Sequence, residues 1–209
     1  MKKILIAILL LGILLSMSTT YAESEDYDPQ AYGMWDIFSY VDEFGLPIGS
    51  IYIGAKEPVN GVYSERGQDD SEVTAIITYE QVLSSVSTGF YGFVCIELYM
   101  NGTELIANPE GPEEDYDIKI LDSDGNRFST TGEMGEGSSR IMITVFSDEN
   151  GIVEAGQEPV LDALLKGGSI KIAISEKGNY LADYVLSIDD VSGFEAAYKY
   201  FQSTFGFEV

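Results

Sequence analysis

The sequence contains no histidine and a single cysteine, Cys95. Without histidine, the chain has no Ser-His-Asp or Cys-His catalytic machinery, no histidine-ligated zinc and no histidine pH switch. One cysteine forms no intramolecular disulfide, so the stability of the fold has to come from its core. Cys95 lies between Val94 and Ile96, which favours a buried, inert thiol over a nucleophile or an interchain disulfide.

Basic residues are scarce, with 11 Lys and Arg against 35 Asp and Glu and a net charge of −24. Nucleic acid is therefore excluded as a partner, because phosphate contacts need clustered Lys and Arg. An acidic surface attracts cationic partners or divalent cations. The alternative is that the acidity only keeps the protein soluble. Lys171, Lys177 and Lys199 are scattered along the sequence and indicate only solvated faces.

The apolar run 4–15 follows Lys2 and Lys3 and precedes small and polar residues that end at Ala22. This order is typical of a secretory signal peptide, and the run is shorter than the roughly 20 residues of a membrane-spanning helix. We predict cleavage after Ala22, which leaves 187 residues with a net charge of −26, since two lysines and no acid are removed. The expected location is secreted or periplasmic, with no membrane attachment after cleavage.

The rest of the chain divides into residues 23–33, an acidic and turn-rich lead-in that we expect to be flexible, and a single domain over residues 34–209. Apolar and polar residues alternate in segments such as 73–79 and 169–175, as in strands with one wet face. Turn residues separate the segments, so the architecture is an antiparallel sandwich or barrel. Of these we predict a mainly β fold with an antiparallel β-sandwich.

Two segments have helical spacing. Residues 159–166 begin with proline and end before Gly167 and Gly168, as a short helix does. Near the C-terminus we predict a second helix over residues 193–204. One face of this second helix carries apolar and aromatic residues, which we expect to pack on a sheet: Phe194, Ala197, Tyr198 and Phe201.

Residues 35–53 read WDIFSYVDEFGLPIGSIYI. This stretch resembles the W…VDEFGxPxGxxYI motif of a family of exported bacterial proteins, and residues 164–168 and 192–198 are also similar to that family. Members often carry aspartate where Leu46 stands and threonine where Ile48 stands. The family has no established activity, so the resemblance implies export and a β-rich layout and supplies no mechanism.

A candidate calcium site lies at Asp122, Asp124 and Asn126. Alternate oxygen side chains followed by Gly125 are typical of a calcium-binding loop, and Glu133 stands at the twelfth position counted from Asp122. The intervening segment reads as a strand rather than as the start of a helix. Asp, Gly and Asn are also the preferred residues of hairpin turns, so a plain turn and a calcium site remain alternatives.

Asp42 and Glu43 precede a Gly-x-Pro-x-Gly turn. Paired carboxylates can hydrolyse glycosides when they face each other about 5–10 Å apart across a cleft, whereas adjacent acids in a turn usually face water. We therefore predict a non-catalytic exported binding or interaction module with a protein or glycan partner and no cofactor. The alternatives are a calcium-stabilised adhesive or structural module and a carboxylate-based glycan hydrolase.

Overall fold

The computed structural model describes residues 29–65, 71–83, 90–100, 103–104, 114–135, 138, 140–146, 158–177 and 182–204. The predicted signal peptide, residues 1–22, and the first part of the predicted lead-in, residues 23–28, lie outside these ranges. Within them, no helix has the length and apolar character needed to cross a membrane.

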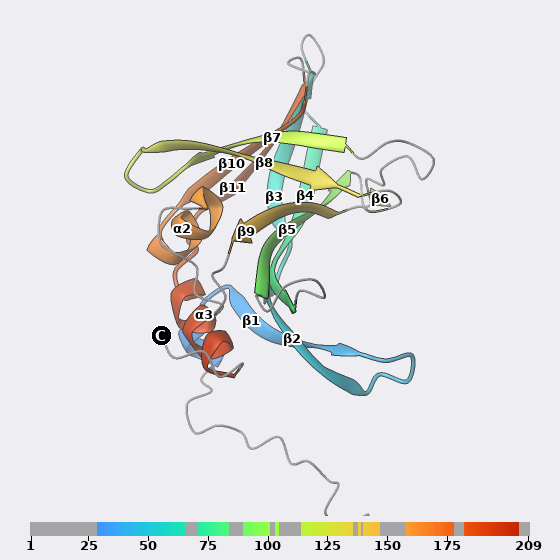
Figure 1. Ribbon diagram of the computed structural model, residues 1–209. Helices are drawn as coiled ribbons and strands as arrows, with labels where there is room; N and C mark the ends of the chain where they lie inside the picture. The colour runs from blue at the N-terminus through green and yellow to red at the C-terminus, as the bar shows by residue number, and fades with distance from the viewer. Residues whose placement is uncertain are drawn as a thin grey trace, which may run out of the picture.

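Strands dominate the described chain, with two α-helices and one 3₁₀ helix (Figure 1). In chain order the elements are η1 (Pro29–Tyr32), β1 (Trp35–Val41), β2 (Pro47–Ala55), β3 (Val59–Glu65), β4 (Ser71–Leu83), β5 (Phe90–Met100), β6 (Thr103–Glu104), β7 (Glu114–Leu121), β8 (Arg127–Met134), β9 (Arg140–Phe146), α2 (Pro159–Lys166), β10 (Ile170–Glu176), β11 (Ala182–Ile188) and α3 (Phe194–Thr204). The mainly β prediction is confirmed.

Eight strands form a closed antiparallel barrel in the order β4-β3-β11-β10-β7-β8-β9-β5, and β5 pairs back onto β4. The predicted β-sandwich is therefore wrong. Alternation of apolar and polar residues marks one dry and one wet face in both architectures. This alternation does not say whether the outermost strands of the sheet meet. Here they do, because β4 and β5, at the two ends of the order, pair with each other.

The inward side chains fill the barrel as one core. An eight-stranded barrel is just wide enough for side chains to fill it. Aliphatic residues predominate among the fully buried positions that these strands contribute: Ile77, Val94, Ile96, Ile118, Ile141, Ile143, Val145, Ile172, Ile174 and Leu186.

Gly132 in β8 marks a point where the wall comes close to the core. A Cβ at Gly132 would lie 2.7 Å from Cγ2 of Ile141 and 2.9 Å from Cδ1 of Ile118. Both distances are too short for carbon atoms, so a larger residue would force the core to shift. Glycine inside a strand often marks such a close approach in a barrel.

Both predicted helices are confirmed, and α3 packs its aromatic face on β1, β2 and β4. The indole nitrogen of Trp35 donates to the carbonyl of Val191 at 3.1 Å. The ring of Trp35 meets Phe194 edge-on with centroids 4.9 Å apart, and Tyr79 meets Phe201 at 5.6 Å. Tyr32 is buried beside Tyr200, so the folded domain includes residues that the sequence assigned to the lead-in.

The β1–β2 hairpin lies outside the barrel. In the described part of the chain, the hairpin pairs with the wall where Ile53 and Gly54 lie opposite Tyr79 and Thr78 of β4. From there it extends away from the barrel as a separate arm (Figure 1). We call residues 38–52 the arm and residues 41–48 its tip.

We predict that Gly132→Ala lowers the free energy of unfolding by about 1–3 kcal/mol, the usual cost of overpacking a core. Gly135→Ala is the matched control, because a Cβ at Gly135 would meet nothing within 4 Å, and its effect should stay below about 0.5 kcal/mol. Urea unfolding followed by tryptophan fluorescence measures both. Equal stabilities of the two variants would show that the barrel has room at β8.

Candidate functional site

The predicted hairpin turn after β7 is present. One oxygen of Asp122, Oδ1, accepts from the backbone nitrogens of Asp124 at 3.0 Å and Asn126 at 2.8 Å. The backbone of Asp122 also bonds to Asn126 at 3.1 Å, and Gly125 adopts a φ of +82°, which glycine tolerates best. The aspartate thus holds the turn closed from inside.

Lys166, at the end of α2, fills the space between the carboxylates of this turn. Its Nζ lies 2.7 Å from Oδ2 of Asp122 and 2.6 Å from Oδ2 of Asp124. The ammonium group and the amide of Asn126 hold the pKa of the Asp122 carboxyl well below its usual range. No cluster of three or more His, Cys, Asp or Glu side chains able to hold a metal occurs in the described ranges.

The calcium site at Asp122, Asp124 and Asn126 stays a prediction, and a calcium ion there would have to displace Lys166. The ammonium already supplies the positive charge that the two carboxylates need. The arrangement ties the β7–β8 hairpin to α2 across 44 residues of sequence.

We predict that Lys166→Ala lowers the melting temperature at pH 7 and that the loss becomes smaller below about pH 4. Because the pKa of Asp122 is lowered in the folded state, the ion pair contributes its full stabilisation above the unfolded pKa of about 4. This contribution declines below that pH and vanishes only as pH falls through the lower folded pKa. Differential scanning fluorimetry from pH 3 to pH 8 measures this. A loss of melting temperature that is as large at pH 3 as at pH 7 would contradict it.

The same scan with calcium or chelator at matched ionic strength tests the calcium prediction. A rise in melting temperature with calcium that is lost in Asp122→Asn, Asp124→Asn would show that calcium displaces the lysine.

Asp42 holds a second turn, at the tip of the arm. Its Oδ1 accepts from the backbone nitrogens of Phe44 and Leu46, both at 2.9 Å, and Gly45 adopts a φ of +78°. This oxygen therefore closes a loop, and Glu43 follows it on the same exposed turn. The two carboxylates proposed for glycoside hydrolysis are neighbours on one turn and do not face each other from separate elements.

The two turns share one hydrogen-bonding pattern and differ in their side chains. In each, the aspartate amide bonds to the carbonyl four residues on, and the glycine amide bonds back to the aspartate carbonyl. The positions of Phe44 and Leu46 in the tip are occupied by Asp124 and Asn126 in the other turn. The turn geometry therefore does not require apolar residues at the tip.

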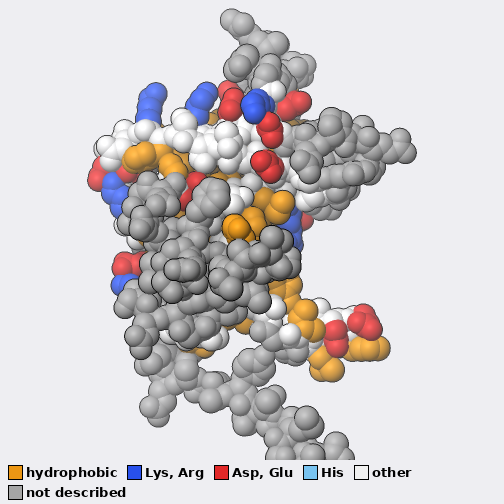
Figure 2. All heavy atoms as spheres, viewed as in Figure 1, with side chains coloured by type: hydrophobic (Ala, Val, Ile, Leu, Met, Phe, Trp, Pro, Cys, Tyr) orange, Lys and Arg blue, Asp and Glu red, His pale blue; other side chains and the backbone are white. Residues whose placement is uncertain are grey.

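The tip nevertheless carries four large apolar side chains that face solvent. The exposed fractions are 54% for Val41, 80% for Phe44, 61% for Leu46 and 60% for Ile48. These are four of the seven exposed large apolar side chains found in the described part of the chain. Hydrophobic and acidic side chains lie together at the end of the arm (Figure 2). A cluster of this kind marks an interaction surface more often than isolated exposed apolar residues do.

The root of the arm is braced on the barrel wall. The rings of Phe38 and Tyr40 lie 5.4 Å and 4.9 Å from that of Tyr52 across the hairpin. Burial and a hydrogen bond with Glu80 of β4 raise the pKa of Tyr40 above its usual value. Glu80 in turn accepts from Arg140 of β9 at 3.1 Å. The tip is therefore presented from a fixed base.

Cys95 is buried in β5, as the sequence indicates. Burial, with the nearby Glu80 carboxylate, raises the pKa of its thiol to about 12. A neutral thiol is neither a nucleophile nor a metal ligand.

We predict that Cys95 reacts with an aromatic disulfide reagent at least a hundredfold more slowly in the native protein than in urea, because the thiol is buried and protonated. The absorbance of the released thiolate measures the rate. Fast native labelling would show that β5 opens readily.

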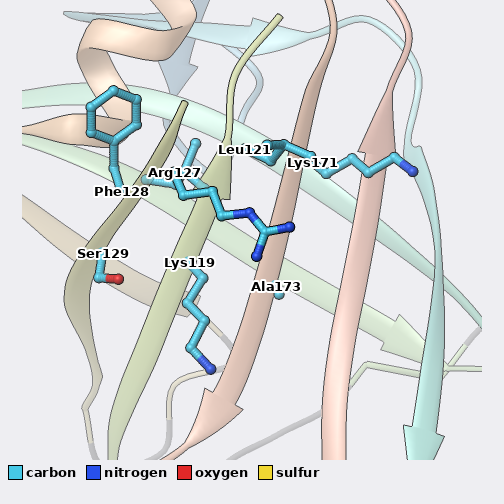
Figure 3. A pocket seen from close by; sticks show the side chains of 8 residues that line it. Lys119, Leu121, Arg127, Phe128, Ser129, Lys171 and Ala173 are labelled. Carbon is cyan, nitrogen blue, oxygen red and sulfur yellow. The ribbon is translucent and has the colours of Figure 1, made fainter. Parts of the chain in front are cut away.

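A second surface feature lies on the outer wall of β7, β8 and β10. A groove with a volume of about 310 Å³ is lined there by three cationic side chains, Lys119, Arg127 and Lys171 (Figure 3). Leu121 is flanked by Lys171 on one side and by Arg127 on the other, because the strands pair in that register. We call this feature the cationic groove.

The cationic groove is not predicted from the sequence, because Lys171 stands alone there as a solvated residue. The three cations are dispersed along the chain and meet only through the pairing of β7 with β8 and β10. The one available signal is their alternation with inward residues such as Ile120 and Ile172, which places them on the outer face.

Comparison with known proteins gives no relative. No protein-family model matches the chain, and neither a curated protein nor a solved structure matches it. The features that bear on function are therefore the arm and the cationic groove.

Proposed function

We propose that this protein is an exported, non-catalytic binding module that engages a protein partner through the tip of its β1–β2 arm. The observation that carries the proposal is the exposure of four large apolar side chains at the tip, two of which, Phe44 and Leu46, lie on a turn whose hydrogen bonds do not need apolar residues. Exposed apolar area costs solubility, and a contiguous cluster of it is typical of a contact surface.

The arm is suited to present such a surface. Preordered contact residues lose little conformational freedom on binding, which improves affinity. Stacking of Phe38 on Tyr52 and the contact of Tyr40 with Glu80 stiffen the base. Phe44, 80% exposed at the apex, has the character of an aromatic anchor that fills a partner's pocket.

The side chains of the tip indicate what kind of surface the partner would offer. Residues 41–49 contain Asp42 and Glu43 and no Lys or Arg. A matching surface would offer an apolar depression rimmed by cations, since opposite charges across an interface fix orientation and speed association. Export, expected from residues 1–22, would place the contact outside the cytoplasm.

A photo-cross-linker at the tip tests the proposal. Glu43→Cys introduces a reactive thiol at an exposed position, while Cys95 is buried, so a maleimide cross-linker attaches at one site. We predict a specific cross-linked protein product on the exported chain, reduced at least about tenfold when Phe44→Asp and Leu46→Asn are added. The introduced side chains, Asp and Asn, are those that occupy the matching positions of the Asp122 turn, so the tip should stay folded.

The matched control removes exposed apolar side chains from the barrel wall instead. Val62 and Met142 are 40% and 37% exposed, and Val62→Thr with Met142→Gln should leave the product unchanged. Equal cross-linking by the tip variant and the control would refute a role for the tip.

A further inference from the structure

The three cations of the groove form no ion pair with any described residue, whereas four other described cations do. Arg140, Lys166, Lys177 and Lys199 each form an ion pair with a carboxylate. The three cations of the groove form none with any described residue, although the chain holds 35 Asp and Glu. Like charges on neighbouring strands repel one another, so an anion received between them would relieve the repulsion.

The floor of the groove is apolar. Leu121 and Ala173 lie between the cations, and Phe128, which also lines the groove and is 40% exposed, points away from them (Figure 3). A simple inorganic anion would leave this apolar surface in water. The fitting occupant therefore combines acidic groups with apolar side chains in one compact element.

We infer that the cationic groove receives the arm tip of a second copy of this chain, so that copies associate head to tail. The inference rests on the proposed function, since it names the partner of the tip. The tip supplies acids, chiefly Glu43, together with Phe44 and Leu46, and the groove supplies cations around an apolar floor. Each surface thus offers what the other lacks.

The tip of a chain cannot reach the cationic groove of the same chain. The tip and the strands β7, β8 and β10 lie at opposite ends of the molecule (Figure 1). A contact between unlike surfaces leaves one tip and one groove free in every pair. Association therefore continues into longer assemblies, or into a ring where the rotation between copies closes.

Two variants each remove one half of the contact. Phe44→Asp, Leu46→Asn alters the tip, and Lys119→Glu, Lys171→Glu reverses the groove through outward side chains. Lys177→Glu, Lys199→Glu is the control for the groove, because it changes the net charge equally at exposed ion pairs outside it. A cooperative thermal unfolding transition in each variant would serve as the check that it folds.

Analytical ultracentrifugation of the exported chain across concentration, at about 0.15 M salt, gives the readout. We predict a concentration-dependent series of oligomers for the wild type and the control. Each variant alone should weaken association at least about tenfold and run as a monomer. An equimolar mixture of the two should form a dimer and nothing larger, because only one intact tip and one intact groove can meet.

Other outcomes overturn the inference in distinct ways. Self-association of the groove variant at wild-type strength would assign the contact to the tip alone. A wild type that stays monomeric while the Glu43 cross-linker captures a different protein would remove the head-to-tail contact and leave the proposed function standing. Unchanged cross-linking and unchanged association in the tip variant would remove both.

Discussion

The antiparallel pairing of β3 with β11 closes the barrel, and the rest of the structure depends on that closure. Gly61 lies opposite Leu186 in this pairing, and a Cβ at Gly61 would stand 2.7 Å from the carbonyl oxygen of Val185. Glycine therefore permits the close approach of the two strands. On one side of the ring, β4 and β5 pair as a long hairpin. On the other side, the pairing of β3 with β11 joins the N-terminal strands to the C-terminal strands, so that all eight strands enclose one core.

Closure also determines which strands are left over. β5 runs along one edge of β4, and β3 takes residues 71–75 on the other edge. Further along that same edge, β2 pairs with Thr78 and Tyr79. The β1–β2 hairpin is consequently held at its root, where Trp35 contacts Phe194 of α3, and its far end extends into solvent. The barrel wall and α3 therefore hold the root of the arm in place, and within the described part of the chain neither of them holds its tip.

Local features could be predicted from the sequence, and features set by distant pairing could not. Pro159 and Gly167 delimit a helix through short-range rules, and Asp122 reads as a turn residue for the same reason. Closure into a barrel rather than a sandwich depends on which strands meet. The contact of Lys166 with Asp122 spans 44 residues, and the cationic groove exists only through the register of three strands. The oxygen atoms of the Asp122 turn suggest a calcium site in the sequence, but the sequence does not show that Lys166 contacts those oxygens.

The acidity of the chain has a further consequence for association. Copies of this chain repel one another in most orientations, because acidic residues far outnumber basic ones, 35 to 11. The repulsion is overcome only where a local excess of positive charge meets acids, and among the described residues the unpaired cations lie in the groove around Leu121. At about 0.15 M salt the screening length is about 8 Å, so long-range repulsion is reduced while close contacts persist. Apolar contact by Phe44 would then supply affinity, and the acidic surface would exclude other arrangements of the same two molecules.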